Sequence, residues 1–282
     1  MAWKPLMSRI KNMMILLCIL GAGMVLHIFA VRGRSGHPGL EQLRGWSYAH
    51  RGLHDAQKPE NSMAAFRAAL EHGYGIEFDL HLLKDGNLAV MHDSDLLRTT
   101  GREGRMEDLT TEDLKEYHLG GTGETIPEFR QVLELFDGKA PLIIELKSVD
   151  ENYALLTETA CRMLEDYKGP YCLESFDPRC IRWLRKNRPE LIRGQLSENF
   201  MKTGYGYSWP LRFVTSYNLE NFLTMPDFIA VRFQDRKTAS TVLCRRLWKL
   251  QGVSWTLRTQ QEYDAAVQEG WLPIFENFIP EE

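Results

Sequence analysis

Residues 75–80 read Gly-Ile-Glu-Phe-Asp-Leu, and this short stretch decides the fold. In a β-strand, side chains two residues apart lie on the same face. The carboxylates Glu77 and Asp79 therefore share one face, and the apolar side chains beside them share the other. We expect the apolar face to pack under helices and the two carboxylates to point into the interior of a barrel. A solvated edge strand with ordinary polar alternation is the alternative.

Residues 141–147, Pro-Leu-Ile-Ile-Glu-Leu-Lys, form a second apolar run that ends in charged residues. This run places Glu145 and Lys147 on one face, and a buried ion pair between them is one interpretation. Together with Glu77 and Asp79, however, Glu145 completes three carboxylates from strand ends. Three oxygen ligands suit Mg²⁺ or Ca²⁺ and do not suit zinc. A divalent cation would also neutralise the repulsion between buried carboxylates, and Lys147 would then meet an anion.

Strand-like runs alternate with helical patterns throughout residues 47–282. The eight predicted strands are 48–51, 76–83, 142–147, 171–175, 192–196, 228–231, 254–258 and 272–275. Asn61 is expected to cap the first helix of this region. The alternation predicts parallel strands with crossover helices, and eight strands favour a TIM (β/α)8 barrel over an open doubly wound sheet. Residues 93–126 are polar and rich in glycine, which predicts a small insertion after the second strand, over one rim of the barrel.

Two histidines stand at the ends of apolar runs, His50 in Ala-His-Arg-Gly and His92 in Val-Met-His-Asp. Either histidine alone is commonly structural. Combined with a metal and the cations Arg51 and Lys147, they describe a site that cleaves phosphodiesters. One imidazole would take a proton from the nucleophile, and the other would give one to the leaving oxygen. The remaining histidines His54, His81 and His118 are expected to be peripheral.

The motifs HRGLHDAQKPENSMAAFRAAL, GIEFDLHLLKDGNLAVMHDSDLLRTTGREGRMEDLTTEDL, IPEF and LIIELK lie between residues 48 and 148. Together they resemble the glycerophosphodiester phosphodiesterase family. The resemblance is dense over this segment and thin beyond it. It implies a TIM barrel in which residues 93–126 are the family's insertion.

The resemblance also implies roles for individual residues. The implied metal ligands are Glu77, Asp79 and Glu145, with Mg²⁺ or Ca²⁺ as cofactor. The implied acid and base are His50 and His92. Arg51 and Lys147 would contact phosphate, Glu60 and Asn61 would lie at the rim or behind the ligands, and Trp255 would line the alcohol pocket.

Two departures from the family pattern lie toward the end of the chain. Arg258 stands where the family usually has asparagine, and Phe275-Glu276-Asn277 replaces its usual aspartate-proline ending. Both changes fall where the leaving alcohol would be recognised.

Residues 13–31 contain no formally charged residue. A helix of this length spans about 28 Å, close to the roughly 30 Å hydrocarbon thickness of a bilayer. We therefore predict a basic flank over 1–12, a transmembrane anchor over 13–31, a linker over 32–46 and a phosphodiesterase barrel over 47–282. A signal peptide cleaved near Gly21–Gly23 is the alternative. Basic residues flank the span on both sides, so the charges leave the orientation of this single-pass protein open.

The composition fits a globular enzyme. The chain has 282 residues, of which 44% are hydrophobic and 26% charged, which excludes general disorder. The net charge is −4; residues 1–44 carry +5, which leaves −4 − 5 = −9 for residues 45–282. An acidic body gives no electrostatic support for binding nucleic acid.

We expect a membrane-anchored, metal-dependent hydrolase of phosphoric diesters, which converts glycerophosphodiesters to sn-glycerol 3-phosphate and an alcohol. Two alternatives remain open. One is a lysophospholipase D type reaction on lysophospholipids, with a lipid phosphodiester as the substrate. The other is an inactive barrel that serves as a membrane-tethered binding module.

Overall fold

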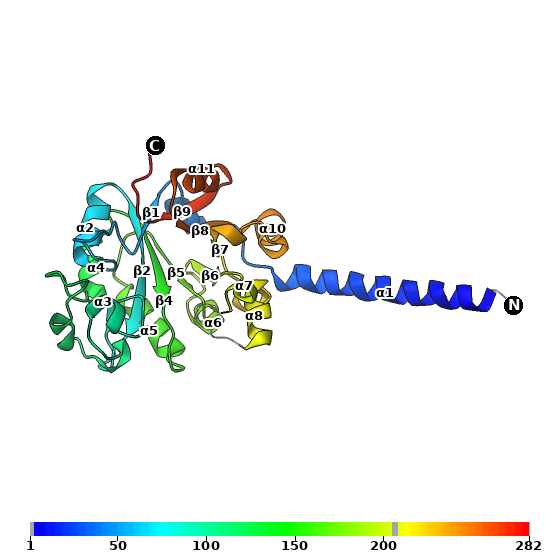
Figure 1. The fold of residues 1–282 in the computed structure, drawn as a ribbon, viewed down its shortest axis with the longest axis horizontal. Coiled ribbons are helices and arrows are strands. Elements are labelled where there is room, and N and C mark those ends of the chain that lie inside the picture. The colour runs from blue at the N-terminus through cyan, green and yellow to red at the C-terminus, as the bar shows by residue number, and fades with distance from the viewer. Residues whose placement is uncertain (1–2, 205–207, 282) are drawn as a thin grey trace.

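A closed barrel of eight parallel strands forms the body of the protein. The computed structural model describes residues 3–204 and 208–281 (Figure 1). The barrel strands are β1 (Tyr48–His50), β2 (Gly75–Leu82), β4 (Leu142–Leu146), β5 (Tyr171–Ser175), β6 (Arg193–Ser197), β7 (Phe228–Arg232), β8 (Gln251–Leu257) and β9 (Trp271–Phe275). They pair in that order, and β1 pairs with both β9 and β2, which closes the sheet. The predicted TIM barrel is confirmed.

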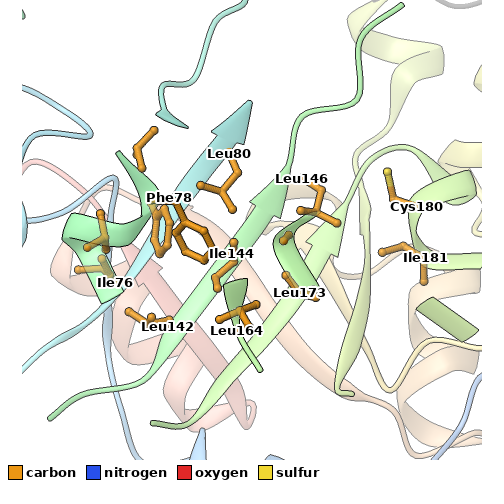
Figure 2. Packing of buried hydrophobic residues seen from close by; sticks show 14 of the residues in the cluster. Ile76, Phe78, Leu80, Leu142, Ile144, Leu146, Leu164, Leu173, Cys180 and Ile181 are labelled. Atoms are coloured by element: carbon orange, nitrogen blue, oxygen red, sulfur yellow. The ribbon is translucent and has the colours of Figure 1, made fainter. Parts of the chain in front are cut away.

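The faces of the strands divide as the sequence pattern predicts. On β2, Ile76, Phe78 and Leu80 are fully buried in the layer between the strands and the helices, together with Leu142 and Ile144 of β4 (Figure 2). The covering helices are α2 (Met63–Glu71), α4 (Phe129–Phe136), α5 (Tyr153–Met163), α6 (Pro178–Asn187), α7 (Phe200–Thr203), α8 (Trp209–Ser216), α9 (Asn221–Thr224), α10 (Ala239–Arg246) and α11 (Gln260–Gln268). The alternate side chains of the strands point into the barrel.

The predicted insertion is present and begins earlier than residue 93. A short strand, β3 (Leu88–Val90), pairs antiparallel with the end of β2. Helix α3 (Leu97–Thr100) and the 3₁₀ turns η2 (Met106–Asp108) and η3 (Asp113–Glu116) follow it. The insertion has an apolar cluster of its own, which consists of Leu83, Ala89, Met91, Leu96, Met106, Leu109, Leu114, Leu119 and Ile126. This core holds the insertion over the end of β2, where the candidate site residues lie.

The amino end of the barrel is covered by the segment before β1. Leu40 in its 3₁₀ turn η1 (Pro38–Gln42) is buried, and so is Leu43, which follows the turn. Both leucines join the cluster inside the barrel that contains Tyr48 and Phe228. The expected linker over 32–46 connects the first helix to β1, and the structure shows that it also packs against the barrel. The loop-like glycines and prolines of this segment gave no sign of that packing.

Helix α1 (Trp3–Ala30) projects away from the barrel (Figure 1). Residues Met7–Ala30 form a helix long and apolar enough to cross a membrane, and none of its most apolar window is buried in the protein. The helix begins before the uncharged span that starts at residue 13. The charged residues that precede this span are also compatible with a helix.

Candidate active site

Three buried carboxylates meet at the carboxyl ends of β2 and β4. The strand register places Asp79 beside Glu145, and Glu77 lies two residues before Asp79 on the same face. Ligand oxygens of Glu77, Asp79 and Glu145 all lie within 4.8 Å of one another. The three residues are 1–7% exposed, and Oε2 of Glu77 has no hydrogen-bond partner among the described residues. A buried, partly unpartnered set of carboxylate oxygens fits a hard divalent cation.

The three carboxyl groups differ in their proton affinity. Burial raises the pKa of Glu77 well above its ordinary value, and the neighbouring Asp79 and Glu145 raise it further. Burial also raises the pKa of Glu145, although Lys147 opposes this shift. For Asp79 burial acts in the same direction, but Lys147, His92 and Arg51 hold its pKa well below the ordinary value. Asp79 is therefore the anionic centre of the cluster.

Lys147 and Arg51 surround Asp79. Lys147 Nζ lies 3.0 Å from Asp79 Oδ1 and 2.8 Å from Glu145 Oε1. Burial alone would lower the pKa of Lys147, but the two carboxylates raise it above its ordinary value, so the ammonium stays charged. Arg51 Nε lies 3.4 Å from Asp79 Oδ2, and its Nη1 donates to Glu60 Oε1 over 3.0 Å. Two fixed cations thus lie beside the carboxylates, where a phosphate would find positive charge.

The loop after β1 aims Arg51 and Asn61 at the cluster. Both residues adopt left-handed backbone conformations, with φ of 56°, and such strain is typical of functional sites. Asn61 Nδ2 donates to Asp79 Oδ2 over 2.9 Å. The expectation that Asn61 caps α2 is wrong, because the side chain of Ser62 accepts from the backbone N–H of Ala65 and caps the helix instead. This arrangement leaves Asn61 available to orient Asp79.

His50 lies between Glu77 and Glu276. Its Nε2 is 3.7 Å from Glu77 Oε2, and its Nδ1 is 3.0 Å from Glu276 Oε1. Burial lowers the pKa of His50 to about 4, although Glu276 opposes the shift. Burial also acts on Glu276, but donation from His50, His54 and Arg258 holds its pKa far below the ordinary value. A neutral His50 beside an ionised Glu276 must donate from Nδ1, which leaves Nε2 as a base facing the carboxylates.

His92 lies on the other side, at the start of the insertion. Its Nδ1 is 2.6 Å from Asp93 Oδ1, and its side chain is 33% exposed. Hydrogen bonds from His92 and Arg98 lower the pKa of Asp93. Arg98 in turn donates to both oxygens of Glu60, 2.6 and 3.0 Å away. Asp93 therefore orients the imidazole ring of His92 through Nδ1.

Two of the histidines expected to be peripheral are near the site. His81 is buried behind His92, with Nδ1 2.8 Å from Glu107 Oε1 and Nε2 3.3 Å from the carbonyl oxygen of His92. His54 Nε2 lies 3.3 Å from Glu276 Oε1. That expectation is therefore wrong for His54 and His81, because barrel closure and the insertion bring them behind the two site histidines.

Trp255 at the end of β8 lines the mouth of the barrel. It is half-buried and contacts Phe176 edge-on, with ring centroids 5.7 Å apart. A pocket of about 370 Å³ adjoins the site on the side of β1 and β9. Its lining includes His54, Lys58, Glu276 and Phe278. Arg258 Nε donates to Glu276 Oε2 over 2.9 Å, so the two departures from the family pattern form one ion pair.

Two acidic residues of this region were not singled out from the sequence. Glu174 lies inside the barrel on β5, in register with Glu145, and is 1% exposed. Burial, with Glu145 and Asp79, raises its pKa well above the ordinary value. On β5, Cys172 and Glu174 are two residues apart and therefore share one face of the strand. The same spacing located Glu77 and Asp79. Glu276 was noticed only as a departure, since no local pattern links it to His50.

Carboxylates, two histidines and two cations thus lie at the carboxyl rim of a parallel barrel. Residues 50–279 match the model of the glycerophosphoryl diester phosphodiesterase family, and the chain belongs to that family.

Two curated relatives carry the name glycerophosphodiester phosphodiesterase. The protein of Caldanaerobacter subterraneus subsp. tengcongensis is 38% identical over 159 residues, which are 52% of this chain and 65% of the relative. The protein of Bacillus altitudinis is 38% identical over 130 residues, which are 43% of this chain and 53% of the relative. The chain thus spans less than two thirds of the length of either relative.

The fold has solved counterparts. A phosphodiesterase of Oleispira antarctica, solved in complex with the product sn-glycerol-3-phosphate, superimposes with a TM-score of 0.70. It is 21% identical, and the match covers 86% of this chain and 95% of that one. At this identity the likeness shows the barrel fold.

Proposed function

We propose that this protein hydrolyses glycerophosphodiesters to sn-glycerol 3-phosphate and an alcohol. The observation that carries the proposal is the geometry around Asp79, where three carboxylates and two cations lie between His50 and His92. Family membership and the name of the two curated relatives support the same reaction. The Oleispira antarctica structure contains the corresponding product.

Glu77, Asp79 and Glu145 would hold a divalent cation, Mg²⁺ or Ca²⁺. The fit rests on the unpartnered Oε2 of Glu77 and on a donor set made only of oxygens. When bound, the ion would supply charge neutralisation for the phosphate oxygens. Arg51 and Lys147 would bind the phosphate oxygens that the ion does not contact. Both side chains lie within 3.4 Å of the carboxylate oxygens of Asp79.

His50 would act as the base and His92 as the acid. Nε2 of a neutral His50 can take the proton of the attacking hydroxyl, which belongs to water or to the glycerol part of the substrate. The attacking oxygen forms a bond to phosphorus, the bond between phosphorus and the alcohol oxygen breaks, and His92 supplies the proton that this oxygen needs. Where the glycerol hydroxyl attacks, water then opens the cyclic phosphate to give sn-glycerol 3-phosphate. Asp93 would hold the ring of His92 in place for the transfer. Trp255 would line the pocket for the alcohol.

Helix α1 would anchor the enzyme in a membrane as a single-pass protein. None of its most apolar window is buried within the described part of the chain, and its last turn packs on the barrel, where Phe29 contacts Trp248. A cleaved signal peptide is the competing interpretation of the helix.

Hydrolysis of glycerophosphocholine by the purified protein tests the proposal. Exhaustive removal of divalent cations by a chelator should abolish product formation, and Mg²⁺ or Ca²⁺ should restore it better than Zn²⁺. Full activity in excess chelator would contradict the assigned metal ligands. Activity on lysophosphatidylcholine but not on glycerophosphocholine would favour the lysophospholipase D reaction. A folded protein that binds the cation and hydrolyses neither substrate would be the inactive binding barrel.

A further inference from the structure

Exposed apolar side chains gather on the part of the barrel next to α1. They are Met201 on α7, Trp209, Leu211 and Phe213 on α8, and Phe222 and Leu223 on α9. Trp209 is 66% exposed and Phe213 41% exposed, yet their rings stack on each other with centroids 5.9 Å apart. Isolated exposed apolar residues are ordinary, but a group of this kind on neighbouring helices marks an interaction surface.

The charge of this segment is unlike that of the rest of the barrel. Residues 45–282 carry a net charge of −9, yet residues 200–226 contain a single acidic residue, Glu220, among 27 positions. Glu220 is 3% exposed, so it does not contribute to the surface. Seven of the 27 residues are aromatic, and the charged residues other than Glu220 are Lys202 and Arg212. Aromatic residues with basic and without acidic neighbours are typical of segments that lie in the interface of a bilayer.

The joint between α1 and the barrel fixes where a bilayer would lie. Trp248 Nε1 donates to the carbonyl oxygen of Ile28 over 2.9 Å, and Ser240 Oγ lies 3.2 Å from His27 Nε2. The carbonyl oxygen of the fully buried Val31 accepts from Asn221 Nδ2 on α9 over 3.4 Å. Because the last turn of α1 is part of the folded body, a bilayer crossed by α1 begins within about one helical turn of α9 and α10. Figure 1 shows α1 leaving the barrel on the side that carries α8 and α10.

A row of aromatic rings connects this surface to the candidate active site. Trp255 at the mouth contacts Phe176, 5.7 Å away, and Phe176 contacts Phe200, 5.8 Å away. Phe200 is the first residue of α7. The three rings follow the carboxyl ends of β8, β5 and β6, so an apolar path leads from the catalytic rim of the barrel to α7 and α8.

We propose that Met201, Trp209, Leu211, Phe213 and Phe222, here called the lipid rim, lie in the interface of the bilayer that α1 crosses. The site would then take phosphodiesters that an acyl chain holds in the membrane, and the chain would lie along the half-buried Phe176. The choice of substrate rests on the proposed phosphodiesterase function, whereas contact of the rim with lipid does not. A water-soluble diester reaches the site without using the rim.

Quenching of tryptophan fluorescence tests the contact without reference to activity. The full-length protein and its Trp209→Phe variant are reconstituted into phosphatidylcholine vesicles, with and without bromine on the acyl chains. The emission that Trp209 contributes is the difference between the two proteins. We expect bromine to quench this difference. A difference of the same size in brominated and unbrominated vesicles would place Trp209 in water and overturn the proposal.

Matched double variants test the role of the rim in catalysis. Trp209→Ser with Phe213→Ser alters the rim, and Leu155→Ser with Val267→Ser alters residues that are 53% and 48% exposed on α5 and α11. Circular dichroism and thermal unfolding check that both variants fold. The rim variant should hydrolyse lysophosphatidylcholine in vesicles at least about tenfold more slowly than the control, with equal rates on soluble glycerophosphocholine.

The two tests separate the failures. Wild-type rates of the rim variant on vesicles would overturn the rim's role in substrate delivery. If the unaltered protein hydrolyses neither substrate, the proposed phosphodiesterase function fails, and the quenching result still decides whether the rim contacts lipid.

Discussion

Replacing Glu276 with glutamine should slow turnover while leaving the substrate and metal sites in place. Glu276 Oε1 lies 3.0 Å from His50 Nδ1, and Arg258 donates to the other oxygen over 2.9 Å. Since these donors keep the pKa of Glu276 far below its ordinary value, the carboxylate is charged throughout the usual assay range. It fixes the Nδ1–H tautomer of His50 and stabilises the imidazolium that forms when Nε2 takes a proton.

The expected magnitude follows from the loss of one charged hydrogen bond. Glutamine keeps an acceptor oxygen and loses the charge, and hydrogen bonds to charged groups contribute about 1.5–3 kcal/mol. At roughly 1.36 kcal/mol for each factor of ten, kcat should fall by about 10-fold to about 160-fold. KM should change little, because Glu276 lies outside the cluster of Glu77, Asp79 and Glu145. Metal affinity should be unchanged for the same reason.

Steady-state kinetics on glycerophosphocholine and calorimetric titration with Mg²⁺ or Ca²⁺ measure these quantities. Glu276→Asp keeps the charge and should recover part of the rate. Glu269→Gln is the matched control, since it breaks an ion pair with Arg236, 3.1 Å long, that is remote from the site. A Glu276→Gln protein that turns over within twofold of the unaltered enzyme would refute the reasoning. Loss of metal affinity without loss of turnover would refute it equally.

Three further predictions follow from the structure. His50→Ala and His92→Ala should each lower kcat by roughly 10²–10⁴ without loss of metal binding. A p-nitrophenyl diester should partly rescue only the variant that lacks the acid, which we expect to be His92→Ala; equal rescue of both would contradict the assignment. Deleting residues 1–26 should leave a soluble enzyme, whereas deleting 1–44 should lower the unfolding temperature sharply, because buried Leu40 and Leu43 each contribute about 2–5 kcal/mol. Burial raises the pKa of Glu220 from 4.5 to about 8, so the folded state keeps a proton that the unfolded state loses and stability falls as pH rises between these values. Glu220→Gln should remove this slope of about 1.4 kcal/mol per pH unit, and exposed Glu134→Gln should not, as thermal unfolding at several pH values can check.

The part of the site that sequence reasoning found depends on local geometry. Glu77, Asp79 and Glu145 were located because a strand repeats every two residues and the apolar partners of these residues mark the opposite face. The same rule, applied to β5, would have added Glu174. The two-residue periodicity predicts reliably which face a side chain occupies wherever the strand is buried on both faces. A shift of the strand by one residue would place a charged side chain among the helices.

The missing part depends on barrel closure. His50 and Glu276 are 226 positions apart in the sequence and meet because β1 pairs with β9. A single sequence does not contain that information, and the departure at Glu276 therefore looked like a change in specificity. The ion pair between Glu276 and Arg258 explains the two departures in a different way. Each of the two unusual residues is the partner of the other, and Glu276 in turn contacts His50.

A divalent cation would offset the concentration of carboxyl groups in the site. Without it, Lys147 and Arg51 face four buried carboxyl groups, and the pKa values of Glu77, Glu145 and Glu174 are all raised, chiefly by burial. A bound cation would lower these pKa values, because its charge favours the ionised carboxylates. Asp79, whose charge is maintained by its neighbours, would be a ligand without such a change in its pKa, whereas Glu77 and Glu145 would need it. The charge of the ion would offset that of its carboxylate ligands, which leaves Lys147 and Arg51 to bind the phosphate of the substrate.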